Sequence, residues 1–109
     1  MKIFLSYTLK DGEVQEELLR EIDAFASWKN LELFIDKLHN LDSEPQTRIE
    51  KEIINSDILM LIGSSSVFQS DWVKKEIVLA RENDLPIYLI KPNEIRNTIK
   101  SVYKNVNKK

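Results

Sequence analysis

The residue whose type and position best suit chemistry is Glu76. It stands four residues after Trp72 in the run S-D-W-V-K-K-E-I. Residues four apart lie on the same side of a helix, so the carboxylate is expected beside the indole. Val73, Ile77 and Ala80 would form the buried stripe of that helix, which places Glu76 at its border. A carboxylate partly removed from water has a raised pKa and suits acid–base or electrostatic catalysis.

Spacing alone also allows a plainer interpretation of Glu76, in which it pairs with Lys74 or Lys75 on the helix surface. Other chemistries are excluded by residue type. The chain has no cysteine, and His39 is its single histidine, so we expect no disulfide, no thiol nucleophile and no zinc centre built from cysteines or several histidines. No glycine-rich nucleotide motif and no calcium-type spacing is present, so we expect neither a metal nor a cofactor.

Composition predicts one domain over residues 1–109, with the last few residues frayed. Hydrophobic residues make up 42% and charged residues 31%, which is typical of a globular chain. No apolar run approaches the roughly 20 residues of a membrane span, and the first apolar segment is too short for a signal peptide. We therefore expect a cytoplasmic protein without a membrane partner. The net charge of −2 does not indicate a nucleic-acid binder.

Strand-like and helix-like segments alternate along the chain. Short apolar runs predict strands at residues 2–7, 31–36, 58–63 and 87–90. Amphipathic spacing predicts helices at residues 12–28, from Pro45 to near Ser56, after Ser70 and after Asn93, with a loop at residues 37–44. The expected helix caps are Asp11, Ser43 with Gln46, Ser70 and Asn93. This order predicts an α/β fold, a flavodoxin-like three-layer α/β/α sandwich whose parallel sheet has the strand order 2-1-3-4.

In such a sheet, ligands bind outside the carboxyl ends of the strands, where the strand order reverses. That point lies between the first and third strands, at the loops of residues 6–11 and 63–70. Both loops are rich in hydroxyl groups and lead toward helix N-termini, which favour anionic groups such as phosphates. The fold alone therefore predicts a ligand site there, without identifying the ligand.

Four motifs stand in order along the chain. They are I-F-L-S-Y followed by Asp11, Asp36 and then Pro45 around the loop after the second strand, I-x-x-S-D before the third strand, and S-D-W-V-K-K-E-I followed by Ala80. Together they resemble the Toll/interleukin-1 receptor (TIR) domain family, in particular its small bacterial, Thoeris-type branch. The resemblance covers about residues 2–91.

The resemblance implies a function. Some TIR domains cleave NAD+ at the nicotinamide–ribose bond, and the glutamate of their W-x-x-x-E box, here Glu76, is catalytic. The chain is thus expected to be a NAD+ glycohydrolase or ADP-ribosyl cyclase in bacterial antiphage defence, with NAD+ as substrate and no further cofactor. A carboxylate suits this chemistry because it stabilises the oxocarbenium-like ribose.

The resemblance also suggests supporting residues. An apolar wall is expected from Phe4, Tyr7 or Trp72. Ribose or phosphate would be bound by Ser6, Ser64 and Ser65, although each serine can equally be a turn or capping residue. Contact with other TIR domains, or self-assembly, is expected through the loop that holds Asp36 and Pro45.

Two alternatives remain open. Other TIR domains are non-catalytic adaptors, so the chain can instead be an interaction module that recruits TIR domains through residues 38–45 and the helix of Glu76. A more distant alternative is a nucleoside deoxyribosyltransferase, which has a related fold and also uses a glutamate.

Overall fold

The sheet has four strands, all parallel, in the order β2-β1-β3-β4. The computed structural model describes residues 1–107, with side chains as far as Val102, so the expected frayed end falls partly on residues 108–109, outside the described part. The strands are β1 (Lys2–Ser6), β2 (Glu32–Phe34), β3 (Ile58–Ile62) and β4 (Ile87–Ile90). The predicted strand order and α/β class are confirmed.

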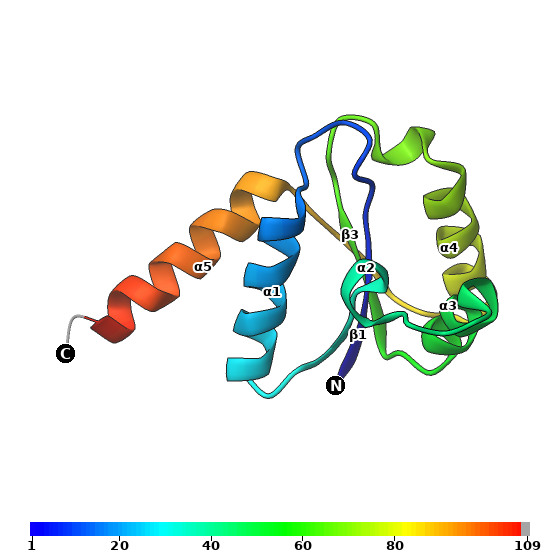
Figure 1. The fold of residues 1–109 in the computed structure, drawn as a ribbon, viewed down its shortest axis with the longest axis horizontal. Coiled ribbons are helices and arrows are strands. Elements are labelled where there is room, and N and C mark those ends of the chain that lie inside the picture. The colour runs from blue at the N-terminus through cyan, green and yellow to red at the C-terminus, as the bar shows by residue number, and fades with distance from the viewer. Residues whose placement is uncertain (108–109) are drawn as a thin grey trace.

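Helices cover both faces of the sheet, which gives three layers (Figure 1). The helices are α1 (Glu16–Trp28), α2 (Asp36–His39), α3 (Pro45–Ile54), α4 (Asp71–Glu82) and α5 (Pro92–Asn107), with a 3-10 turn, η1 (Val67–Gln69), before α4. One face of the sheet packs against α1 and α5, and the other packs against α3 and α4. The strands β1 and β3 lie in the centre of the sheet and are covered on both faces. Their side chains are therefore apolar on both faces and do not alternate with polar residues.

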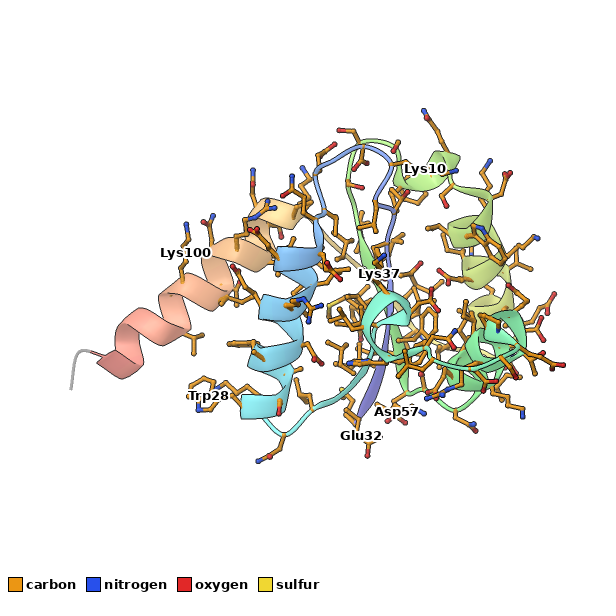
Figure 2. The ribbon with its side chains drawn as sticks, in the orientation of Figure 1. Lys10, Trp28, Glu32, Lys37, Asp57 and Lys100 are labelled. Atoms are coloured by element: carbon orange, nitrogen blue, oxygen red, sulfur yellow. The ribbon has the colours of Figure 1, made fainter. Side chains whose placement is uncertain are left out.

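Two clusters of buried side chains form the core, one on each face. The cluster under α3 and α4 contains Phe4, Phe34, Leu59 and Val73, and the cluster under α1 and α5 contains Leu5, Leu19, Ile35 and Ile62. Trp28 closes the end of α1 and is about half exposed, at 47% (Figure 2). No helix within residues 1–107 is both long enough and apolar enough to cross a lipid bilayer.

The first helix begins later than predicted. It starts at Glu16, not near Gly12, and its N-cap is Gln15, so Asp11 does not cap it. Gly12 has a φ of +73°, a left-handed conformation that glycine adopts without strain. The carboxylate of Asp11 instead accepts hydrogen bonds from the amide of Glu13 and from Ser66, far along the chain.

The segment after β2 also differs from the prediction. The second strand ends at Phe34, and the expected loop contains the one-turn helix α2. Two local contacts hold this turn. Nδ1 of His39 accepts the amide hydrogen of Ile35 (2.9 Å), and Nδ2 of Asn40 donates to Oδ1 of Asp36 (2.7 Å).

Helix caps were predicted with mixed success. The hydroxyl of Ser70 caps α4 by accepting from the amide of Val73 (3.3 Å), as predicted. The capping box of Ser43 with Gln46 does not form, because the N-cap of α3 is Glu44 and no side chain caps that end. Asn93 is not a cap either, because α5 already begins at Pro92.

Candidate active site

A pocket of about 460 Å³ opens beyond the carboxyl end of β1, between α2, α3 and α4. We call it the Tyr7 pocket. Its lining comes from β1 and the following loop (Leu5, Tyr7, Thr8, Leu9, Lys10), from α2 (Asp36, Lys37), from α3 (Pro45, Gln46, Ile49) and from α4 with its cap (Ser70, Trp72, Glu76). The site thus lies at the carboxyl edge of the sheet, as predicted. It is displaced from the expected crevice between β1 and β3 toward α2 and α3.

Glu76 is held in this pocket by the way α4 packs. Val73 and Ala80 are fully buried against the sheet, so the side chain between them on the helix border reaches the pocket wall. Glu76 is half-buried there. The hydroxyl of Ser6, at the end of β1, donates a hydrogen bond of 2.7 Å to its Oε1 atom.

The environment of Glu76 changes its protonation. Burial disfavours the charged carboxylate and is the largest effect, while the hydrogen bond from Ser6 opposes it and the nearby carboxylate of Asp36 reinforces it. The net result raises the pKa of Glu76 from 4.5 to about 7. At neutral pH, therefore, both forms of this carboxyl group are populated, as is useful for a catalytic acid or base.

Tyr7 connects β1 to α2 across the same pocket. Its hydroxyl oxygen accepts the amide hydrogen of Lys37 (3.0 Å). Burial raises the pKa of the Tyr7 phenol to about 12; the hydrogen bond from Lys37 lowers it, and the carboxylates of Asp36 and Glu76 raise it further. The phenol is thus protonated at neutral pH, and its own hydrogen remains available to an acceptor in the pocket.

Asp36, expected in an interaction loop, also lines the Tyr7 pocket. Asn40 orients it through the 2.7 Å bond to Oδ1, and the same Asn40 amide donates to the carbonyl of Pro45 (3.1 Å). Asn40 therefore ties the start of α2 to the start of α3, and the first residues of these two helices, Asp36 and Pro45, both line the pocket. This adds a second carboxylate to the site of Glu76.

Trp72 forms an exposed wall of the site. Its side chain is 53% exposed and lines the Tyr7 pocket next to Glu76, one helical turn away on α4. Nζ of Lys75 lies 5.2 Å from the centre of the indole ring, so a cation is held over the aromatic face. The ring therefore offers a flat apolar surface with positive charge beside it.

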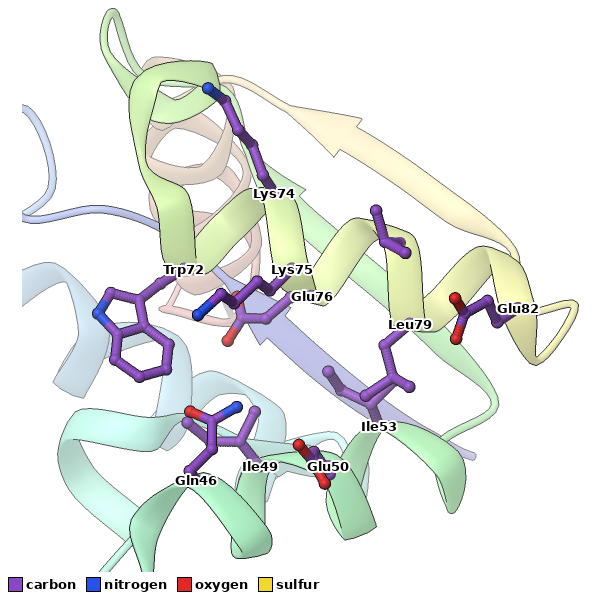
Figure 3. Close-up of a pocket in the computed structure, with 11 residues that line it drawn as sticks. Gln46, Ile49, Glu50, Ile53, Trp72, Lys74, Lys75, Glu76, Leu79 and Glu82 are labelled. Carbon is purple, nitrogen blue, oxygen red and sulfur yellow. The ribbon is translucent and has the colours of Figure 1, made fainter.

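A second hollow, of about 360 Å³, lies between α3 and α4 (Figure 3). We call it the α3–α4 groove. It shares Gln46, Ile49, Trp72 and Glu76 with the Tyr7 pocket, so Glu76 stands where the two hollows meet. The prediction missed this groove and the lining side chains of Gln46 and Ile49, although their spacing three residues apart on the helix after Pro45 was a usable signal.

One expected wall residue lies outside the site. Phe4 is fully buried, at 0% exposure, and its ring stacks on Phe34 with the ring centres 5.5 Å apart. Because β1 is a central strand, the side chain of Phe4 points into the core beneath α3 and α4. Phe4 has no exposed surface with which to contact a ligand. The prediction that it forms an apolar wall of the site is therefore wrong.

The serine loop after β3 also lies away from the pocket lining. The amide of Ser65 donates to Oε2 of Glu13 (2.9 Å), and both the amide and the hydroxyl of Ser66 donate to Oδ2 of Asp11 (2.9 Å each). Ser64 is buried. Carboxylates of this chain thus accept from the Ser65 amide and from Ser66, and neither Ser64 nor Ser65 lines the pocket of Glu76.

Asp11 belongs to this loop contact. Burial would raise its pKa, but the hydrogen bonds from Ser66 and from the amide of Glu13 outweigh burial and lower the pKa to about 2. The carboxylate therefore links the loop after β1 to the loop after β3. Among residues 1–107, no three histidine, aspartate or glutamate side chains gather in a way that could hold a metal ion.

The strand order and the helix layers define a three-layer α/β domain of the flavodoxin-like class. The family model described as "Thoeris protein ThsB, TIR-like domain" matches residues 4–97, and the chain belongs to this family. A search of curated protein sequences finds no match. Among solved structures, the chain is similar in fold to the CMP N-glycosidase BcmB of Clostridium botulinum, with 15% identity over 96% of this chain and 99% of the other, and a TM-score of 0.59.

Proposed function

We propose that this domain cleaves the N-glycosidic bond of a nucleotide, and that its substrate is NAD+, cleaved between nicotinamide and ribose. The observation that carries the proposal is Glu76, a half-buried carboxyl group with a pKa of about 7 in a pocket of about 460 Å³. Membership of the Thoeris TIR-like family supports it. So does the likeness in fold to an enzyme named for cleaving CMP.

The reaction needs little from the protein except charge stabilisation. The bond between C1′ of the ribose and the pyridinium nitrogen breaks, and its electron pair neutralises the nitrogen, so nicotinamide leaves without needing a proton. The ribose is left with an oxocarbenium-like positive charge, which the ionised carboxylate of Glu76 stabilises. Water then attacks C1′ and gives up a proton to Glu76 or solvent, which yields ADP-ribose. Attack by a nitrogen of the adenine ring instead yields a cyclic product.

Other side chains of the Tyr7 pocket have supporting roles in this proposal. The carboxylate of Asp36 attracts the cationic nicotinamide ring of NAD+. The Tyr7 hydroxyl donates to a ligand oxygen, because its acceptor side already takes the amide hydrogen of Lys37. Trp72 covers one face of the ligand. Ser6 acts through Glu76 and favours its ionised form.

Antiphage defence is the biological setting we propose for this activity. The family name assigns the domain to Thoeris proteins, and the resemblance of the sequence implies that such domains act in defence. A product released from NAD+ would then serve as a diffusible signal. The defence role and the reaction are tested separately, because an assay of NAD+ cleavage gives its answer whether or not the protein acts in defence.

The test is to incubate the purified protein with NAD+, with CMP and with a deoxynucleoside plus a second base, and to separate the products. We expect release of nicotinamide from NAD+, lost in Glu76→Gln and kept in Arg81→Gln. Arg81 is exposed on the same helix, lines neither hollow and serves as the control. Cleavage of CMP alone would identify the substrate as a mononucleotide. Base exchange would identify a deoxyribosyltransferase, and NAD+ cleavage that survives in Glu76→Gln would contradict the role of Glu76.

A second candidate function is docking to another TIR domain. Large apolar side chains are exposed on η1 and α4, namely Phe68 (58%), Trp72 (53%) and Val78 (54%). Surfaces of this kind are typical of interaction sites. Sedimentation of the protein over a range of concentrations tests this candidate: assembly that is lost in Phe68→Ser supports it, and a monomer at every concentration contradicts self-assembly.

A further inference from the structure

The Tyr7 pocket and the α3–α4 groove form one continuous cleft with two lobes. Four residues line both lobes, and Glu76 is one of them. A carboxylate that acts on the bond between a base and its sugar must face that bond. The leaving base then lies in one lobe, and the rest of the substrate extends into the other.

The two lobes differ in chemistry. The α3–α4 groove has an apolar floor made of Ile49, Ile53 and Leu79, and Lys75 stands at the end where Trp72 and Glu76 lie (Figure 3). Two carboxylates line this groove as well: Glu50 lies midway along it, between Ile49 and Ile53, and Glu82 lies at its far end. The Nζ atom of Lys75 therefore lies beside Glu76, on its Trp72 side, and beyond Glu76 the groove presents an apolar floor flanked by carboxylates.

That order matches the ADP half of a dinucleotide. A diphosphate needs a cation near the reacting ribose, an adenine ring needs an apolar floor, and its amino group needs an acceptor such as a carboxylate. Glu82 stands six positions after Glu76 on α4, which is about 9 Å along the helix axis and leaves length for more than a ribose. A mononucleotide would fill only the Tyr7 pocket.

We propose that the α3–α4 groove is a binding subsite for the adenosine diphosphate part of a dinucleotide substrate. The reacting ribose then lies at Glu76 and the departing base lies in the Tyr7 pocket. This inference rests on the proposed function for its choice of base. The subsite also has a consequence that does not depend on the reaction. ADP, which has no nicotinamide–ribose bond to cleave, should bind to the groove.

Glu50 offers a sharp variant, because it is exposed and lines the groove but not the Tyr7 pocket. In Glu50→Trp a bulky ring replaces the carboxylate and fills the groove. The matched control is Lys51→Trp, at an exposed neighbouring position that lines neither lobe. Circular dichroism of both variants checks that they fold.

The first measurement is kcat/KM for NAD+ and for nicotinamide mononucleotide, which lacks the adenosine part. We expect wild type and Lys51→Trp to prefer NAD+, and we expect Glu50→Trp to reduce this preference about tenfold, mainly by raising KM for NAD+. An equal loss with both substrates, or a preference that does not change, overturns the subsite.

The second measurement is calorimetric titration of ADP into wild type, Glu50→Trp and Lys51→Trp. Binding to wild type and to Lys51→Trp that is weakened in Glu50→Trp supports the subsite even if no substrate is cleaved, in which case only the proposed reaction fails. If ADP does not bind to wild type, or binds Glu50→Trp equally well, the subsite is overturned, whatever the enzyme cleaves.

Discussion

The hydroxyl of Ser6 donates to Oε1 of Glu76 at 2.7 Å and joins residues that are 70 positions apart in the chain. Ser6 is 1% exposed and ends the central strand β1, so its position is set by the sheet. Glu76 is placed by α4. The bond favours the ionised carboxylate, whereas burial favours the neutral one. Together they place the pKa of Glu76 in the neutral range, where small changes in the site alter its charge.

Replacing Ser6 by alanine tests this balance. Without the donated hydrogen bond, the pKa of Glu76 rises further, so a smaller fraction of the carboxylate is ionised at neutral pH. We expect NAD+ cleavage to fall about threefold or more at about pH 7 and to recover at higher pH. The measurement is the pH profile of kcat/KM. Ser64→Ala, at a buried serine away from the pocket lining, is the control; a profile identical to wild type in Ser6→Ala would show that the bond does not tune the reaction.

The pH dependence of the wild type distinguishes the two substrates. Cleavage of NAD+ uses the ionised Glu76 because nicotinamide leaves without a proton, so kcat/KM should rise with pH through about 7 and then level. A base such as cytosine leaves more readily when an acid protonates it, so cleavage of CMP by protonated Glu76 should fall over the same range. A rate for NAD+ that falls through neutral pH would contradict the proposed role of Glu76.

Glu76 should also affect stability, with a definite sign. Its pKa in the folded protein, about 7, lies above the ordinary value of 4.5, so the native state binds the extra proton between these values. The contribution of Glu76 to stability is therefore fully present below about pH 4.5 and is lost as the pH rises through about 7. Glutamine carries no charge at any of these pH values. At about pH 8 we expect Glu76→Gln to raise Tm by on the order of 5 °C, and at about pH 4 we expect little difference. A Tm that is lower than that of wild type at about pH 8 would contradict the burial argument.

Asp11 should matter for stability and not for catalysis. It accepts hydrogen bonds from Ser66 and Glu13 but does not line the Tyr7 pocket. We expect Asp11→Ala to lower the free energy of unfolding by about 1 kcal/mol, because partly buried donors lose their acceptor. Urea unfolding measures this change, and kcat/KM at a temperature where the variant is folded should stay near wild type. Glu21→Gln, on the exposed side of α1, is the control for a surface charge.

Tyr7 should hold the loop from α2 to α3 in place. Tyr7→Phe keeps the ring but leaves the amide of Lys37 without its acceptor. We expect KM for NAD+ to rise about threefold to tenfold, with faster protease cleavage at residues 37–44. If proteolysis is unchanged while KM still rises, the hydroxyl acts on the ligand and not on the loop.

Much of the fold follows from local patterns. The unbroken apolar run of β3 and the spacing of Val73, Ile77 and Ala80 on α4 predicted the layers and placed Glu76 at a helix border, and the structure confirms both. Ser70 was recognisable as a cap because its hydroxyl acts within its own turn. In these places local preference and tertiary packing agree.

Where the prediction failed, distant contacts decided the outcome. Asp11 would suit a helix N-terminus, but Ser66, 55 residues away, takes its carboxylate. The turn of α2 depends on Tyr7, in the loop after β1, through a hydrogen bond between residues 30 positions apart. Phe4 was expected to form part of an apolar wall of the site, yet strand alternation and a helix layer on that face turn its ring into the core.

The position of β1 has a consequence for how the site opens. This strand pairs with β2 on one side and β3 on the other, and it carries Ser6, whereas α2, which carries Asp36, is a single turn. The amide hydrogens of β1 should exchange with solvent only on global unfolding, while those of residues 37–40 should exchange through local opening. The half of the site that sets the charge of Glu76 is thus the most persistent part of the molecule. We expect α2 to open locally and let a product leave while the fold remains intact.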